Sequence, residues 1–180
     1  MRRALIAAVM ILAIAGFNWS VWRQEALRAG GAVMLLELEP VDPRAPFLGD
    51  YMVLSYRLDA SIRNDLFPKS WNADSTSLPK GGTVAVRLDG NRVARTVRLD
   101  GGSSLAGDEL RLRFVRRGRL AKLAVARAFF FQEGLARDYS RARYGEFRVG
   151  EDGRSLLLGL LDGDLHRIVP EKPAGDEEPP

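Results

Sequence analysis

The sequence predicts an α+β fold, in which an N-terminal transmembrane helix is followed by a mainly antiparallel β domain with two short helices. Three observations support this fold class: an uncharged apolar stretch near the N-terminus, pairs of alternating segments separated by turn residues, and two short segments with helical apolar spacing. The expected organisation is a membrane anchor and stalk at residues 1–31, a mainly β domain at 32–169 and a disordered acidic tail at 170–180.

The apolar stretch from Ala4 to Trp22 carries no formal charge and follows Arg2 and Arg3. A helix needs roughly 20 apolar residues to cross a bilayer, and tryptophans such as Trp19 favour the interface. Because Ala13-Ile14-Ala15 is similar to a signal-peptide cleavage site, a removed leader remains an alternative. The flanking arginines favour an N-terminus inside the cell, which would place the β domain outside the cytoplasmic membrane, in the periplasm.

The segment after the anchor predicts a stalk and then a first strand. Gln24 to Ala29 can continue the helix until Gly30-Gly31, where we expect a helix end and a hinge. Ala32 to Glu39 reads as a strand, and the prolines that follow it predict an extended loop.

The next segment joins a turn to an alternating strand. Gly49 and Asp50 tolerate the backbone dihedrals of a tight turn. One strand face would then carry Met52, Leu54, Tyr56 and Leu58, and the other Tyr51, Val53, Ser55 and Arg57. We therefore expect one of these faces to belong to the core.

Three hairpins and two helices account for the rest of the predicted domain. The first hairpin pairs Thr83–Leu88 with Arg92–Leu99 around a turn in which Gly90 or Asn91 takes a positive φ. The second pairs two alternating runs between Leu110 and Phe131 around a turn at 116–119. The third pairs Phe147–Val149 with Ser155–Leu161 and is followed by a short strand at Leu165–Val169. The helices are Ala60–Phe67, with Asp59 as its cap, and about two turns between Gly134 and Gly145.

Composition removes several classes of function. The chain has no cysteine, which excludes disulfides, thiolate catalysis and cysteine-bound metals. His166 is the only histidine, and Asp162-Gly163-Asp164 is too short for a twelve-residue calcium loop, so we expect a turn, no metal and no cofactor. Nucleic acid is not expected as a partner of a domain outside the cytoplasm.

Positive charge concentrates around the second hairpin. The residues are Arg111, Arg113, Arg116, Arg117, Arg119 and Lys122. They could bind phospholipid headgroups, an acidic partner or an anionic glycan, but arginines on the outer face of a strand are also ordinary solubilising residues, and we favour that second interpretation.

The segment from Gly49 to Tyr56 also carries a family resemblance. Gly49-Asp50-Tyr51-Met52-Val53-Leu54-Ser55-Tyr56 resembles the motif of the bacterial GDYXXLXY family at each of its fixed positions, Gly49, Asp50, Tyr51, Leu54 and Tyr56. The resemblance implies a membrane-anchored protein without an established activity and suggests a multi-pass membrane protein as partner. The motif residues would be structural or partner-binding.

Two function classes remain open. The first is a membrane-anchored accessory protein without a catalytic site, and the sequence favours it. The second is an extracytoplasmic enzyme with a site around Asp50, Tyr51 and Tyr56, in which a carboxylate and a phenol move protons. Signal-peptidase chemistry is disfavoured, because no serine lies between Ser20 and Ser55 and no lysine precedes Lys69.

Overall fold

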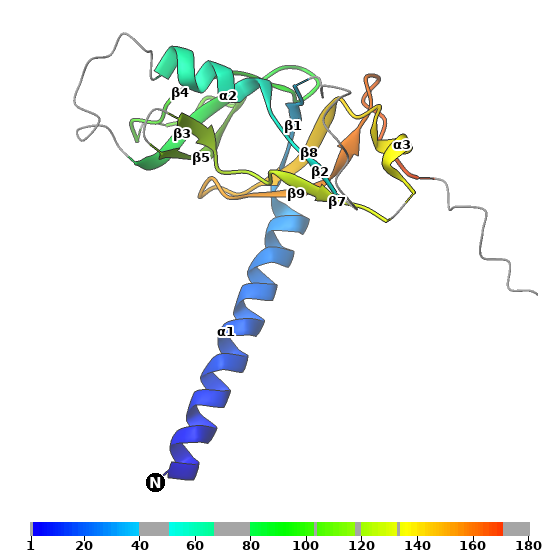
Figure 1. Ribbon diagram of the computed structural model, residues 1–180. Helices are drawn as coiled ribbons and strands as arrows, with labels where there is room; N and C mark the ends of the chain where they lie inside the picture. Colours follow the sequence, from blue (N-terminus) through cyan, green and yellow to red (C-terminus); the bar gives the residue numbers. More distant parts are fainter. Residues whose placement is uncertain are drawn as a thin grey trace, which may run out of the picture.

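The structure is a computed structural model that describes residues 2–39, 51–66, 80–102, 104–117, 120–132 and 134–170. Figure 1 shows a β domain from which a single long helix, α1 (Arg2–Gly30), projects. The expected tail falls outside these ranges, apart from Pro170.

Helix α1 ends where the glycine pair predicts. The amide of Gly31 donates to the carbonyl of Leu27 at 2.9 Å, and a Cβ at Gly31 would lie only 2.5 Å from that oxygen, so a side chain does not fit there. Judged by length and mean hydropathy together, none of the helices in the described ranges qualifies as a membrane span, and the expected span at Ala4 to Trp22 stays a prediction.

The expected hinge after α1 is bridged by contacts. Arg148 Nη1 donates to the Gly31 carbonyl at 3.0 Å, and Arg23 forms an ion pair with Asp152 at 3.5 Å. A Cβ at Gly150 would lie 3.1 Å from the Leu27 side chain, which shows how closely the last turns of α1 approach the domain. The helix is therefore packed on the domain as well as connected to it.

A three-stranded antiparallel sheet joins the two ends of the domain. Its order is β1 (Ala32–Glu37), β8 (Tyr144–Val149) and β9 (Ser155–Leu161), with Met34 opposite Phe147. The predicted first strand and last hairpin are thus confirmed. The short strand expected at Leu165–Val169 is reduced to a single bridge between Leu161 and Arg167.

A four-stranded antiparallel sheet contains the other two hairpins. Its order is β4 (Ala94–Leu99), β3 (Gly81–Leu88), β5 (Glu109–Arg117) and β6 (Leu120–Leu123). In the β3–β4 turn the positive φ belongs to Arg92, at 63°, and the prediction of Gly90 or Asn91 was wrong. The Asp89 carboxylate accepts hydrogen bonds from the amides of Asn91 and Val93, both at 2.9 Å. These hydrogen bonds stabilise a turn whose left-handed residue is Arg92, one position after Asn91.

The motif strand forms a separate two-stranded sheet, here called the motif sheet. It consists of β2 (Tyr51–Val53) and β7 (Ala128–Phe130), and Tyr51 is opposite Phe130. The second predicted hairpin was therefore too long, since the chain leaves β5 after Leu123 and pairs with β2 instead. Because the alternation of apolar and polar residues runs on without a break, the sequence does not reveal that the chain changes its neighbouring strand.

The short helices differ from expectation in their limits. Helix α2 (Arg57–Ser61) begins where the motif strand was expected to continue, and it runs into the π-helix η1 (Ile62–Leu66). Asp59 lies inside α2 and not at its start, and the N-cap residue Tyr56 makes no side-chain cap hydrogen bond. Helix α3 (Ala136–Tyr139) has one turn where two were expected.

One main core joins all three sheets. Its largest enclosed side chains are Tyr56, Phe147, Met34, Leu36, Leu54, Ile62, Leu112, Leu123 and Leu160. Because Leu54 and Tyr56 belong to the motif, the motif segment is one of the places where the sheets are held together.

Candidate functional site

The motif segment separates into an inner and an outer face, as its alternation predicts. Met52, Leu54 and Tyr56 are at most 5% exposed, whereas Val53 is 65% exposed. The alternation of buried and exposed side chains continues beyond the end of β2, because the backbone stays extended and paired there. Leu54 N donates to Arg127 O at 2.8 Å, and Tyr56 forms an isolated antiparallel β-bridge with Leu38.

On the inner face, Tyr56 is held by a hydrogen bond and two ring contacts. Its hydroxyl donates to the Ala126 carbonyl at 2.7 Å, its ring lies edge-on to Phe147 at 5.9 Å, and the Arg127 guanidinium lies 5.1 Å from the ring centre. Burial raises the pKa of Tyr56 far above its usual range; nearby Arg127 acts in the opposite direction and Asp59 adds to the rise. These properties suit a packed tyrosine and not a proton donor in catalysis.

Asp59 completes this inner network, and the sequence reasoning misjudged it as a helix cap. Its Oδ1 accepts the amide of Leu123 at 2.9 Å and Arg127 Nη2 at 3.0 Å, while Arg127 Nη1 pairs with Oδ2. Arg127 Nη2 also donates to Leu123 O at 2.7 Å. The network ties α2 to β6 and to the β6–β7 connection. No local pattern in the sequence marks this network, because Asp59 and Arg127 lie 68 residues apart.

The outer face of the motif sheet is apolar and open. Tyr51, Val53 and Phe130 are 37%, 65% and 74% exposed, and the Tyr51 and Phe130 rings lie 5.7 Å apart. Two motif residues, Gly49 and Asp50, lie outside the described residues. The motif thus has a structural inner face and an outer face whose side chains are available for contact.

The predicted basic residues do not form one surface. Arg111, Arg113, Arg117 and Lys122 lie on the outer side of the β5–β6 hairpin, whereas Arg116 is buried on the side of Leu112 and Phe114. Arg111 pairs with Asp100, and Arg119 lies outside the described residues.

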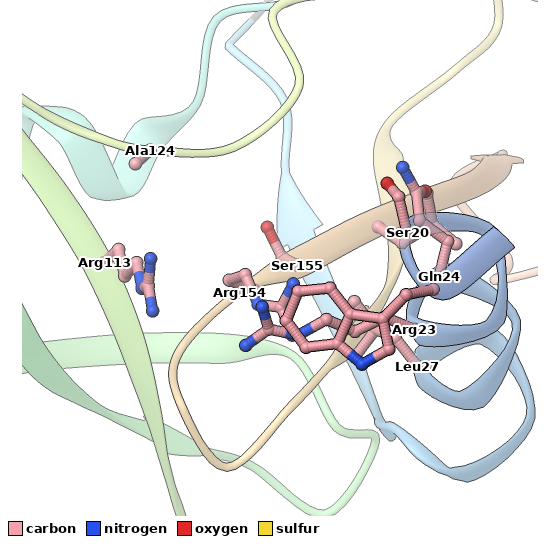
Figure 2. Close-up of a pocket in the computed structure, with 10 residues that line it drawn as sticks. Ser20, Arg23, Gln24, Leu27, Arg113, Ala124, Arg154 and Ser155 are labelled. Atoms are coloured by element: carbon pink, nitrogen blue, oxygen red, sulfur yellow. The ribbon is translucent and has the colours of Figure 1, made fainter. Parts of the chain in front are cut away.

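Arg113 instead contributes to a cavity at the junction of α1 and the β domain, here called the junction cavity. Its volume is about 430 Å³, and its lining residues are Trp19, Ser20, Arg23, Gln24, Leu27, Arg113, Ala124, Arg154, Ser155 and Leu156. Figure 2 shows Arg113 on one side, Ser20 and Gln24 of α1 on the other, and Arg154 and Ser155 between them. Sequence reasoning missed this cavity, because its residues come from four distant segments.

The Asp162-Gly163-Asp164 segment forms the expected turn. Asp162 Oδ1 accepts the amides of Asp164 and His166 at 3.0 and 2.9 Å, and these hydrogen bonds, stronger than the opposing effect of burial, lower the pKa of Asp162. The ligand atoms of Asp162, Asp164 and His166 also lie within 4.8 Å of one another. The hydrogen bonds of the turn run to the backbone amides of Asp164 and His166, and they bring the backbone of the three residues together.

Comparisons with known proteins were informative at the level of families. The model of a family described as GDYXXLXY protein matches residues 13–160, from within α1 to β9. Searches among curated proteins and among solved structures gave no significant match.

Proposed function

This chain belongs to the GDYXXLXY family, and we propose on that basis that it is a membrane-anchored accessory protein whose motif sheet holds a membrane-protein partner. The observation that carries the proposal is the division of the motif into a buried inner face and an exposed apolar outer face. An exposed aromatic pair beside an aliphatic residue is typical of a contact surface.

The anchoring part of the proposal rests on the surface of α1. Leu12, Phe17 and Trp22 are 72%, 69% and 67% exposed, and large apolar side chains surround the helix from Leu5 onward. A helix that is apolar on all sides needs an apolar environment, which a bilayer supplies. One N–H of the Asn18 side-chain amide is satisfied within the helix, since Nδ2 donates to Ile14 O at 2.9 Å.

The position of the domain then restricts the choice of partner. Arg2 and Arg3 favour an N-terminus inside the cell and a β domain on the periplasmic side of the cytoplasmic membrane. Because the last turns of α1 are packed on the domain, the domain would lie at the membrane surface and not at the end of a long tether. This position favours a membrane protein as partner, and the resemblance to the GDYXXLXY family suggests that the partner is a multi-pass protein.

The contacts of Tyr51 and Tyr56 do not favour the alternative function, an enzyme built around Asp50, Tyr51 and Tyr56. Tyr56 is fully buried and donates its hydroxyl proton to a backbone carbonyl. Tyr51 is exposed beside Phe130, on the opposite face from Tyr56, so the two tyrosines cannot act on one substrate atom.

Photocrosslinking in native membranes tests the partner. A photoreactive residue at Tyr51 is expected to capture an integral membrane protein, whereas one at Leu99 on β4, which is similarly exposed at 44%, is expected not to capture it. Recovery of soluble proteins alone, or of lipid alone, from Tyr51 would contradict the proposal. Extraction of the membranes at alkaline pH tests the anchor separately, since an inserted α1 keeps the protein in the membrane fraction.

A further inference from the structure

The junction cavity gathers three arginines from three parts of the chain. Arg23 comes from α1, Arg113 from β5 and Arg154 from the turn between β8 and β9. Arg23 also lies over the Trp19 ring, with 5.2 Å between the guanidinium carbon and the ring centre. The folded chain therefore assembles a cationic site that no single segment contains.

These arginines share one carboxylate. Asp152 Oδ2 lies 3.5 Å from Arg23 Nη2, 3.5 Å from Arg113 Nη2 and 2.6 Å from Arg154 Nε. Three positive charges against one negative charge leave a local excess of two. The arginine side chains are 36% to 49% exposed, and each guanidinium has five N–H donors, so Asp152 leaves much of their hydrogen-bonding capacity unused.

The remainder of the lining is suited to an amphiphilic ligand. Leu27, Leu156 and Trp19 provide apolar surface, while Ser20 and Gln24 provide polar groups. The hydroxyl oxygen of Ser155 is buried and has no hydrogen-bond partner in the described part of the chain. A volume of about 430 Å³ lies within the usual range of small-molecule sites, roughly 300 to 1,000 Å³.

We propose that the junction cavity binds the phosphate group of an anionic ligand, with the arginine guanidiniums as its donors. Planar guanidiniums match the oxygens of a phosphate in geometry and charge. A phospholipid headgroup and a soluble phosphate ester both present this chemistry, and the apolar part of the lining favours the lipid. The inference does not depend on the proposed partner, because it concerns another surface and can be measured on the purified chain.

Binding can be measured on the full-length chain in a maltoside detergent, which carries no phosphate. The probes are dihexanoyl phosphatidylglycerol, glycerol 3-phosphate and inorganic phosphate, titrated at constant ionic strength by calorimetry and by tryptophan fluorescence, to which Trp19 should respond. Tighter binding of the lipid than of both soluble probes supports a headgroup as the source, and equal binding of all three supports a soluble phosphate. Binding of none of them would overturn the proposal.

Variants of two lining residues assign the binding to this cavity. Arg113→Gln and Arg154→Gln should each weaken binding about tenfold, the loss expected for one charge-assisted hydrogen bond, and Lys at the same positions should weaken it less. Arg87→Gln is the matched control, because Arg87 is 58% exposed, pairs with an acidic residue and lies outside the cavity. Gln variants that keep the circular dichroism spectrum and bind as tightly as the Arg87→Gln control would overturn the assignment.

Discussion

Asp59 and Asp152 are two of the aspartates that pair with arginine in this protein, and they differ in what surrounds them. Asp59 is 4% exposed, and both its oxygens are used by Arg127 and a backbone amide. The Asp152 side chain is 36% exposed and faces three guanidiniums. In the first network the donors and acceptors are matched around a buried carboxylate, although the Arg127 side chain is 31% exposed. In the second network the donors are in excess and the carboxylate is open to solvent. A matched, buried network stabilises the fold, whereas an open site with excess donors has capacity for a ligand.

Removing the buried charge should have the largest effect. Asp59→Asn leaves Arg127 without its counter-charge, and we expect the free energy of unfolding to fall by about 2 kcal/mol, less than for a fully buried ion pair because the Arg127 side chain is 31% exposed. Asp152→Asn is the control and should cost less than about 1 kcal/mol, because exposed ion pairs contribute little. Denaturant unfolding measures both, and equal losses would abolish the distinction between the two sites.

The tyrosine of the same buried network should show a smaller loss. Tyr56→Phe keeps the ring against Phe147 but leaves the Ala126 carbonyl without its donor. We expect a loss of about 1.5 kcal/mol, within the range for a buried unsatisfied group. Tyr51→Phe, on the outer face, should stay within about 0.5 kcal/mol of the parent. If thermal unfolding ranked these two variants the other way, the division into inner and outer faces would be wrong.

The open site depends on a turn that only glycine fits well. Gly153 has φ +76°, and a Cβ there would lie 3.2 Å from the Arg113 amide nitrogen and from the Leu112 carbonyl carbon. Gly153→Ala should therefore cost about 1 kcal/mol and move the turn with Asp152 and Arg154 away from β5. Gly90→Ala is the control, since nothing lies within 4 Å of its Cβ position and it is not among the residues with positive φ. A double-mutant cycle on Arg113 and Asp152, measured in the parent and in Gly153→Ala, tests this movement. The coupling energy between the two residues should be smaller in Gly153→Ala than in the parent.

The comparison also explains which features could be predicted from the sequence. The first and last hairpins follow from strand alternation and turn residues, both of which are local, and so does the inner face of Leu54 and Tyr56. The Asp59–Arg127 pair joins positions 68 residues apart, and the junction cavity joins α1 to Arg113 and Arg154, so neither has a local pattern. The second hairpin was drawn too long because alternation shows which face is buried and not which strand is the neighbour.

A third carboxylate, Glu109, lies between the two extremes and sharpens the comparison. Its side chain is 6% exposed, like that of Asp59, but its partner Arg98 is 42% exposed, compared with 31% for Arg127. Two hydrogen bonds of 3.0 and 2.6 Å join Arg98 to Glu109. The bonds from Arg98, with help from the Ala106 amide, lower the pKa of Glu109 from 4.5 to about 2.

This shift sets the direction and range of a pH effect. Because the pKa is lower in the folded chain, the unfolded chain binds the proton more tightly, so Glu109 stabilises the fold above pH 4.5. That stabilisation should decline as the pH falls from about 4.5 to about 2, and Glu109→Gln should reduce the slope of stability against pH in that range. The effect should be the smallest of those described, because the exposed arginine is screened by water and salt. Unfolding curves between pH 2 and pH 6 at two salt concentrations measure the slope, and a Glu109→Gln slope equal to that of the parent would show that the half-exposed pair contributes as little as Asp152.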